Sequence, residues 1–147
     1  MELVPITAAR VPVSSPAEQL FLSPDYLTAS RWLPTAAPEA TAIALYRRAV
    51  GLGNSNAMNN LAWMLQLGRG VERKNPEEAA DLMLKALELR NEFAYRQMTQ
   101  NSRAWGREFR QALQAKLRDA GVYSGKIDGE LRDTSIAAIN AYINRKR

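Results

Sequence analysis

The sequence contains no cysteine and no histidine. Their absence excludes thiolate nucleophiles, serine–histidine–aspartate triads and imidazole bases, and it removes the ligands that most protein zinc sites use. No disulfide can form, although this does not fix the compartment. Glycine-rich phosphate loops and nucleophile elbows are also missing from the sequence. We therefore expect no catalytic residue, no metal and no cofactor.

Long apolar runs are missing too. No stretch approaches the ~18 apolar residues that a membrane-spanning helix needs, so we expect no membrane insertion. Residues 1–19 lack the basic and apolar regions of a secretory signal, which favours the cytoplasm unless the chain is part of a longer secreted or anchored protein of the cell envelope or periplasm. The net charge is +5, but no basic stripe is interleaved with aromatic residues, so we expect no nucleic-acid partner.

Alanine and leucine dominate what is present, and β-branched runs are scarce, which predicts an all-α fold. From residue 38 the apolar spacing predicts helices over 38–52, 56–67, 76–89 and 91–101. Asn56, Asn75 and Asn91 stand where helix caps are expected, and Pro76 suits a first helical position. Glycine-containing segments, 51–54 and 68–71, separate these helices.

Residues 1–37 form a separate, proline-rich arm. Its prolines prevent a long helix. Its apolar side chains are too numerous for a free linker, so we expect the arm to lie across the helices that follow and to cover their open end. A linker without fixed structure is the alternative. The apolar residues in question are Phe21, Tyr26, Leu27, Trp32 and Leu33.

The chain matches itself when it is shifted by 37 residues. A period of this length is typical of stacked helical hairpins, in which small alanines let helices approach closely. The shared alanines, leucines and one asparagine therefore predict two related hairpins. The matched pairs are Ala42 and Ala79, Leu45 and Leu82, Ala49 and Ala86, Leu52 and Leu89, Asn54 and Asn91, and Ala57 and Ala94.

Residues 39–100 resemble a Sel1-like repeat of the tetratricopeptide-like class. The resemblance lies in an alanine-framed helix with Tyr46, in the turn Gly53-Asn54, and in the loop Gly68-Arg69-Gly70-Val71. One departure is Arg90, which stands where the second unit should repeat Gly53. The resemblance implies a bacterial protein-interaction scaffold, often in envelope or signalling contexts, without enzymatic activity of its own.

Stacked hairpins offer a concave face to partners. On the helix predicted over 56–67, the partner-binding candidates are Asn59, Asn60, Trp63 and Gln66. Trp63 has an alternative role in the core, which is the commoner place for such a tryptophan.

The C-terminal residues predict a helix, a glycine loop and a second helix. Gly121 is expected to end the first helix, and Gly125 and Gly129 to supply positive φ angles in the loop. Asp133 or Thr134 is expected to cap the last helix.

This region resembles the peptidoglycan-binding domain type 1 family, which has a small three-helix fold. The motifs are Leu113-Gln114-x-x-Leu117, the loop from Gly121 through Tyr123 to Asp128-Gly129, and a final helix with Ala138 and Tyr142. The departures are Leu131-Arg132-Asp133, where the family usually has Phe-Gly-Pro, and Ile143, where it usually has glutamine. They keep the apolar positions of the fold but change the surface on which the family would bind glycan.

Three residues of this region are glycan-binding candidates. Tyr123 could stack on a sugar face or pack between helices, and we favour packing. Asp128 could accept a sugar hydroxyl or form a turn, and we favour the turn. Arg132 could meet an acidic stem peptide or remain solvated.

Two acidic clusters, one around Glu77 and one around Asp128, could in principle hydrolyse glycosides, but helix-start and loop positions explain them better. We therefore predict an arm (1–37), a Sel1-like repeat (38–102) and a peptidoglycan-binding-like domain (103–147). Modules this small are marginal alone, so we expect them to pack together. The predicted function is a non-enzymatic scaffold that binds a protein, with peptidoglycan as the candidate ligand of the C-terminal module. The alternative is a cytoplasmic adaptor, or a regulatory tail of a larger protein, that binds only protein.

Overall fold

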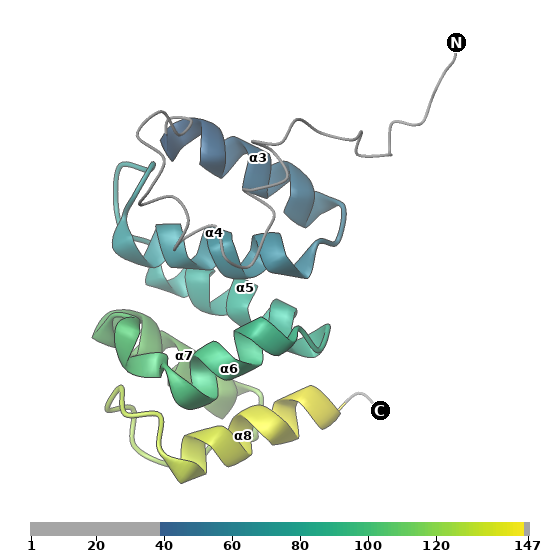
Figure 1. The fold of residues 1–147 in the computed structure, drawn as a ribbon. Coiled ribbons are helices and arrows are strands. Elements are labelled where there is room, and N and C mark those ends of the chain that lie inside the picture. Colours follow the sequence, from purple (N-terminus) through teal and green to yellow (C-terminus); the bar gives the residue numbers. More distant parts are fainter. Residues whose placement is uncertain (1–38, 146–147) are drawn as a thin grey trace.

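The computed structural model describes residues 39–145 (Figure 1). Over this range the chain is all-helical, as predicted, and contains no strand. The predicted arm, residues 1–37, lies outside the described residues. The helices are α3 (Glu39–Gly51), α4 (Ser55–Leu67), α5 (Pro76–Glu88), α6 (Glu92–Gln100), the 3₁₀ helix η2 (Ser102–Ala104), α7 (Arg107–Asp119) and α8 (Asp133–Asn144).

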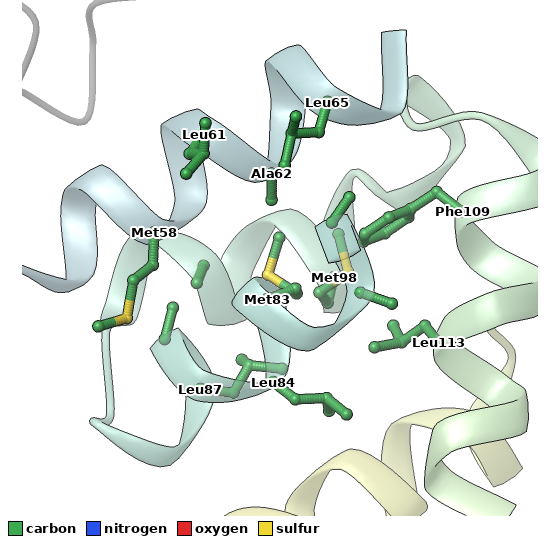
Figure 2. Close-up of a cluster of buried hydrophobic side chains, with 14 of the residues drawn as sticks. Met58, Leu61, Ala62, Leu65, Met83, Leu84, Leu87, Met98, Phe109 and Leu113 are labelled. Carbon is green, nitrogen blue, oxygen red and sulfur yellow. The ribbon is translucent and has the colours of Figure 1, made fainter. Parts of the chain in front are cut away.

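Helix α5 lies at the centre of the fold. It contacts α4, α6, α7 and α8, while α3 packs on the outer side of α4 (Figure 1). A single apolar core runs through these helices, from Ala42 in α3 to Ile139 in α8. In Figure 2, side chains of α4, α5, α6 and α7 converge, including Met83, Met98 and Phe109. The helices before and after residue 103 therefore pack on one another, as expected.

The two turns that follow α3 and α5 have the same hydrogen bonds. Asn54 N–H donates to the Ala49 carbonyl and Asn91 N–H to the Ala86 carbonyl, both at 3.0 Å. Each asparagine side chain then accepts a bond from a backbone N–H three residues later, at 2.9 Å for Asn54 and 2.8 Å for Asn91. The two sets of bonds lie 37 residues apart, which is the shift at which the sequence matches itself.

The predicted cap of α4 was wrong by two residues. Asn54, which is extended at φ −76° and ψ 110°, caps the helix, because the turn places its side chain over the Ala57 N–H. Asn56 lies inside α4, and its side-chain oxygen accepts a hydrogen bond from the Asn91 amide at 2.8 Å. Asn56 thus joins the first hairpin, α3 and α4, to the second, α5 and α6.

The loop between α4 and α5 lies against the start of α3. Gly68 ends α4 at φ 79°, and Asn75 caps α5 by accepting from the Glu78 N–H, as predicted. Gly70 has φ 77°, and a Cβ atom there would lie 2.8 Å from the Glu39 carbonyl oxygen. Only glycine therefore fits this approach.

The C-terminal region differs from its prediction in helix number. Residues 103–145 form two α-helices, α7 and α8, joined by the loop 120–132, and only the end of the short η2 precedes them. The implied third helix is not formed there. The predicted caps of α8 were also wrong, because α8 already begins at Asp133 and no side chain bonds to its first turn from the cap position, Arg132.

Gly121 follows the end of α7 as predicted, and of the two glycines predicted to have positive φ only Gly129 does. Gly121 and Gly129 have φ angles of 83° and 81°. Gly125 is not in the left-handed region, and its role is to leave room for a side chain. A Cβ atom at Gly125 would lie 2.6 Å from the Tyr123 hydroxyl oxygen.

Candidate functional site

The four partner-binding candidates of α4 lie mostly inside the fold. Asn59, Asn60 and Gln66 are buried, so the expectation that they line an exposed face is wrong. The segment that follows α6 covers the end of α4 at Gln66, whose side-chain oxygen accepts a hydrogen bond from the Gly106 N–H at 2.9 Å. Trp63, which is half-buried, packs edge-on against Trp105 with ring centroids 5.0 Å apart.

Tyr123 and Asp128, two of the three glycan-binding candidates, both face the Gln114 amide and bond within the loop. Tyr123 is 8% exposed, and its hydroxyl donates to the Lys126 carbonyl at 2.6 Å. One carboxylate oxygen of Asp128 accepts from the Glu130 N–H at 2.9 Å. Both side chains therefore hold the loop itself, in line with the packing and turn roles that we favoured.

Arg132, the third candidate, lies at the surface. Its guanidinium is 3.5 Å from the second carboxylate oxygen of Asp128. Hydrogen bonds from the Glu130 N–H and from the Gln114 amide, together with the charge of Arg132, lower the pKa of Asp128 below its ordinary value. Asp128 is thus held ionised between the loop and solvent.

Gln114 is the residue that organises this loop. It is fully buried, and its side-chain oxygen accepts from the Gly129 N–H at 2.7 Å. Its amide nitrogen faces the Tyr123 hydroxyl, the Asp128 carboxylate, the Glu130 carbonyl and the Ser135 hydroxyl at 3.1–3.3 Å. The sequence motif contained this glutamine, but its apolar neighbours gave no indication of its partners.

The acidic clusters are engaged in ion pairs. Glu77 and Asp81 of α5 lie 3.4 and 3.0 Å from the Lys116 ammonium of α7. Burial lowers the pKa of Lys116, but these two carboxylates outweigh it and raise the pKa above its ordinary value. Glu78 receives two hydrogen bonds from Arg47, and this pairing raises the Arg47 pKa. The carboxylates thus join α3 to α5 and α5 to α7.

A cleft between α6 and α8 was not predicted from the sequence. Its volume is about 550 Å³, within the usual range for ligand sites. Leu87 and Ile143 supply apolar surface, and polar side chains supply most of the remainder. These are Arg90, Asn91, Glu92, Tyr95, Arg96, Asn140 and Asn144.

Hydrogen bonds across the cleft fix its two walls. The Tyr95 hydroxyl donates to the Asn140 side-chain oxygen at 2.8 Å, and Arg90 donates to the Asn144 side-chain oxygen at 3.2 Å. The end of α8 is also fastened, because Arg145 lies 3.3 Å from the Glu88 carboxylate and stacks over the Tyr142 ring. Four of the polar side chains that line the cleft are therefore held in fixed positions, namely Arg90, Tyr95, Asn140 and Asn144.

Arg90 has an unusual backbone. Its φ of 60° is the only positive value for a non-glycine residue within 39–145. The matching position of the first turn is Gly53, at φ 86°. For a side chain other than glycine, this conformation costs about 1–2 kcal/mol. The departure of Arg90 from the repeat pattern was the one sequence signal that pointed to this cleft.

No protein-family model, curated protein or solved structure matches this chain. None of the helices in the described range is long and apolar enough to cross a membrane. Among the same residues, no three acidic side chains are grouped so that they could hold a metal ion.

Proposed function

We propose that this protein is a non-enzymatic scaffold that binds a protein partner through Sel1-like helical hairpins, with the C-terminal helix α8 completing the binding surface. The observation that carries the proposal is the cleft between α6 and α8, whose walls are fixed by hydrogen bonds between Tyr95 and Asn140 and between Arg90 and Asn144. Preformed polar groups over an apolar base favour binding, because little side-chain freedom is lost when a partner docks.

The turns give the hairpin interpretation further support. The hydrogen bonds around Asn54 recur around Asn91, although glycine at 53 is replaced by arginine at 90. A recurring turn is typical of stacked repeats, which commonly serve as binding surfaces.

Peptidoglycan binding by the C-terminal module is the second candidate. The exposed guanidinium of Arg132 favours it, since this group could meet an acidic stem peptide. The internal bonds of Tyr123 and Asp128 weigh against it, because both side chains are already used within the loop. The protein-only alternative, an adaptor or a regulatory tail, is the interpretation that we prefer.

Two binding assays separate these candidates. In the first, the purified protein is sedimented with insoluble peptidoglycan, and Arg132→Gln is compared with Lys126→Gln, a second exposed cation of the same loop. In the second, proteins of the source organism that the immobilised chain retains are identified, purified singly and tested for saturable binding by calorimetry.

The scaffold proposal expects saturable one-to-one binding of a purified partner and no sedimentation at physiological salt. Sedimentation that Arg132→Gln abolishes and Lys126→Gln does not would establish the second candidate. If no retained protein binds saturably after purification, the scaffold proposal is wrong.

A further inference from the structure

We propose that the cleft between α6 and α8 binds an acidic segment of the partner protein, with Arg90 and Arg96 contacting its carboxylates. This inference rests on the proposed scaffold function and names the chemistry of its ligand. Three features of the cleft carry it: the balance of charge, the backbone of Arg90, and the apolar surface at its base.

The charge of the cleft is unbalanced. Two guanidinium groups, Arg90 and Arg96, line it with a single carboxylate, Glu92. Three other arginines of the described residues, Arg47, Arg69 and Arg103, each lie within 4 Å of a glutamate carboxylate, whereas the exposed Arg73 and Arg107 do not. Neither Arg90 nor Arg96 has such a partner among residues 39–145. Each can therefore accept a carboxylate from outside, in the paired geometry that guanidinium favours.

The backbone of Arg90 gives an independent indication. A turn of the same hydrogen bonding is made with glycine at position 53, so the fold does not need a side chain at position 90. A side chain held at a strained φ is a recognised feature of binding sites. Here the strained residue places its guanidinium within 3.2 Å of Asn144 on the opposite wall.

The base of the cleft sets the shape of the ligand. Leu87 and Ile143 provide an apolar surface between the two walls. A volume of about 550 Å³ accommodates a short peptide segment. The fitting ligand is therefore an extended segment with one apolar side chain between acidic residues.

The probes are three fluorescein-labelled peptides measured by fluorescence anisotropy. One has a central leucine flanked by two glutamates on each side; the second has lysines in place of the glutamates; the third has serine in place of the leucine. The acidic leucine peptide should bind, and its affinity should fall as salt screens the charges. The lysine peptide should not bind, and the serine peptide should bind more weakly.

Arg90→Gly is the decisive variant, since it removes the guanidinium while relieving the backbone. Its melting temperature should equal or exceed that of the wild type, so weaker binding could not be attributed to misfolding. The affinity for the acidic leucine peptide should fall about tenfold or more, and Arg96→Gln should have a similar effect. Arg73→Gln is the matched control. It removes an exposed arginine before α5, at the end of that helix opposite to the cleft.

Three results would overturn the proposal: equal binding of the acidic and basic peptides, no saturable binding of the acidic peptide, or equal weakening by Arg73→Gln. The purified partner separates this proposal from the scaffold function. If the partner binds with unchanged affinity to the Arg90→Gly and Arg96→Gln variants, the scaffold function stands and the cleft assignment falls. If no partner binds but the acidic peptide binds as expected, the cleft recognises acidic segments and the scaffold function falls.

Discussion

The hairpin region, residues 39–100, and the C-terminal region, residues 107–145, hold their loops in different ways. In the hairpins each turn is closed locally, by an asparagine that bonds to the helix it precedes and by a residue with positive φ. In the C-terminal region the loop 120–132 is held from outside by Gln114, which belongs to α7. The first arrangement closes each turn with its own residues, whereas the second depends on side chains of α7, chiefly Gln114 with Arg110, that bond to one loop.

The largest effect is therefore expected for Gln114→Ala. This change leaves the buried Gly129 N–H without a partner, at about 1–3 kcal/mol, and removes one bond from each loop acceptor. It also empties the space that the fully buried side chain fills. We expect the free energy of unfolding to fall by about 3 kcal/mol or more, as measured by urea denaturation.

Gln111→Ala provides the control for this prediction, since Gln111 lies one turn earlier in α7 and is only partly buried. It should change the free energy of unfolding by about 0.5 kcal/mol or less. Equal losses in the two variants would show that Gln114 acts through helix α7 in general and not through the loop.

A glycine pair tests how the hairpin region depends on close backbone approach. Gly53 and Gly70 both have positive φ, but only at Gly70 would a Cβ atom meet backbone, 2.8 Å from the Glu39 carbonyl oxygen. Gly53→Ala should cost about 1 kcal/mol, for the backbone conformation alone. Gly70→Ala should cost about 2–3 kcal/mol, because the start of α3 must also move. Thermal unfolding of both variants checks this, and equal costs would mean that the α3 contact adds nothing.

Helix caps and helix-ending glycines could be predicted from the sequence. Asn75-Pro76 and Asn91 start helices as expected, because a cap and its helix are close in sequence. Gly68 and Gly121 end helices for the same reason. The cap of α4 was misplaced because Asn54 and Asn56 both stand before the helix, and only the geometry of the turn distinguishes them.

Features that depend on distant partners could not be predicted in this way. Asn59 and Gln66 suggested an exposed polar face, but a segment some 40 residues later, including Trp105 and Gly106, packs near this helix. The cleft joins α6 to α8 through Tyr95 and Asn140, 45 residues apart. No local pattern brings such positions together, and only the mismatch of Arg90 with Gly53 indicated that this turn was special.

The two caps offer a smaller test of the same contrast. Asn54 and Asn91 each accept one backbone bond, but the Asn91 amide also donates to Ser55 and Asn56 at 2.8 Å. Asn54→Ala should cost about 1 kcal/mol, the usual value for a lost cap. Asn91→Ala should cost about 2 kcal/mol, because a link between the hairpins is lost with it. Chemical denaturation measures both, and a larger loss for Asn54→Ala would contradict the assignment of Asn91 as the link.

The smallest effect concerns charge in the C-terminal loop and should depend on pH. The folded state lowers the pKa of Asp128, chiefly through hydrogen bonds from Glu130 and Gln114. Ionised Asp128 therefore stabilises the fold above the unfolded pKa of about 3.9, and this contribution is lost as pH falls through the lower folded pKa. Asp128→Asn keeps an oxygen that can accept both bonds but carries no charge. The melting temperature of the wild type should exceed that of Asp128→Asn at neutral pH, and the difference should vanish in strong acid.

Asp119→Asn separates this loop effect from a general effect of removing an acid. Asp119 lies exposed at the end of α7, and the guanidinium of its neighbour Arg118 lies 3.8 Å from its carboxylate. The melting temperature of Asp119→Asn should stay close to that of the wild type from neutral pH to strong acid, because no bond in the loop depends on the charge of Asp119. A difference between the wild type and Asp128→Asn that persists unchanged in strong acid would mean that Asp128 acts by its shape alone. The loop would then depend on Gln114 without help from ionisation, and the contrast with the locally closed hairpin turns would be sharper still.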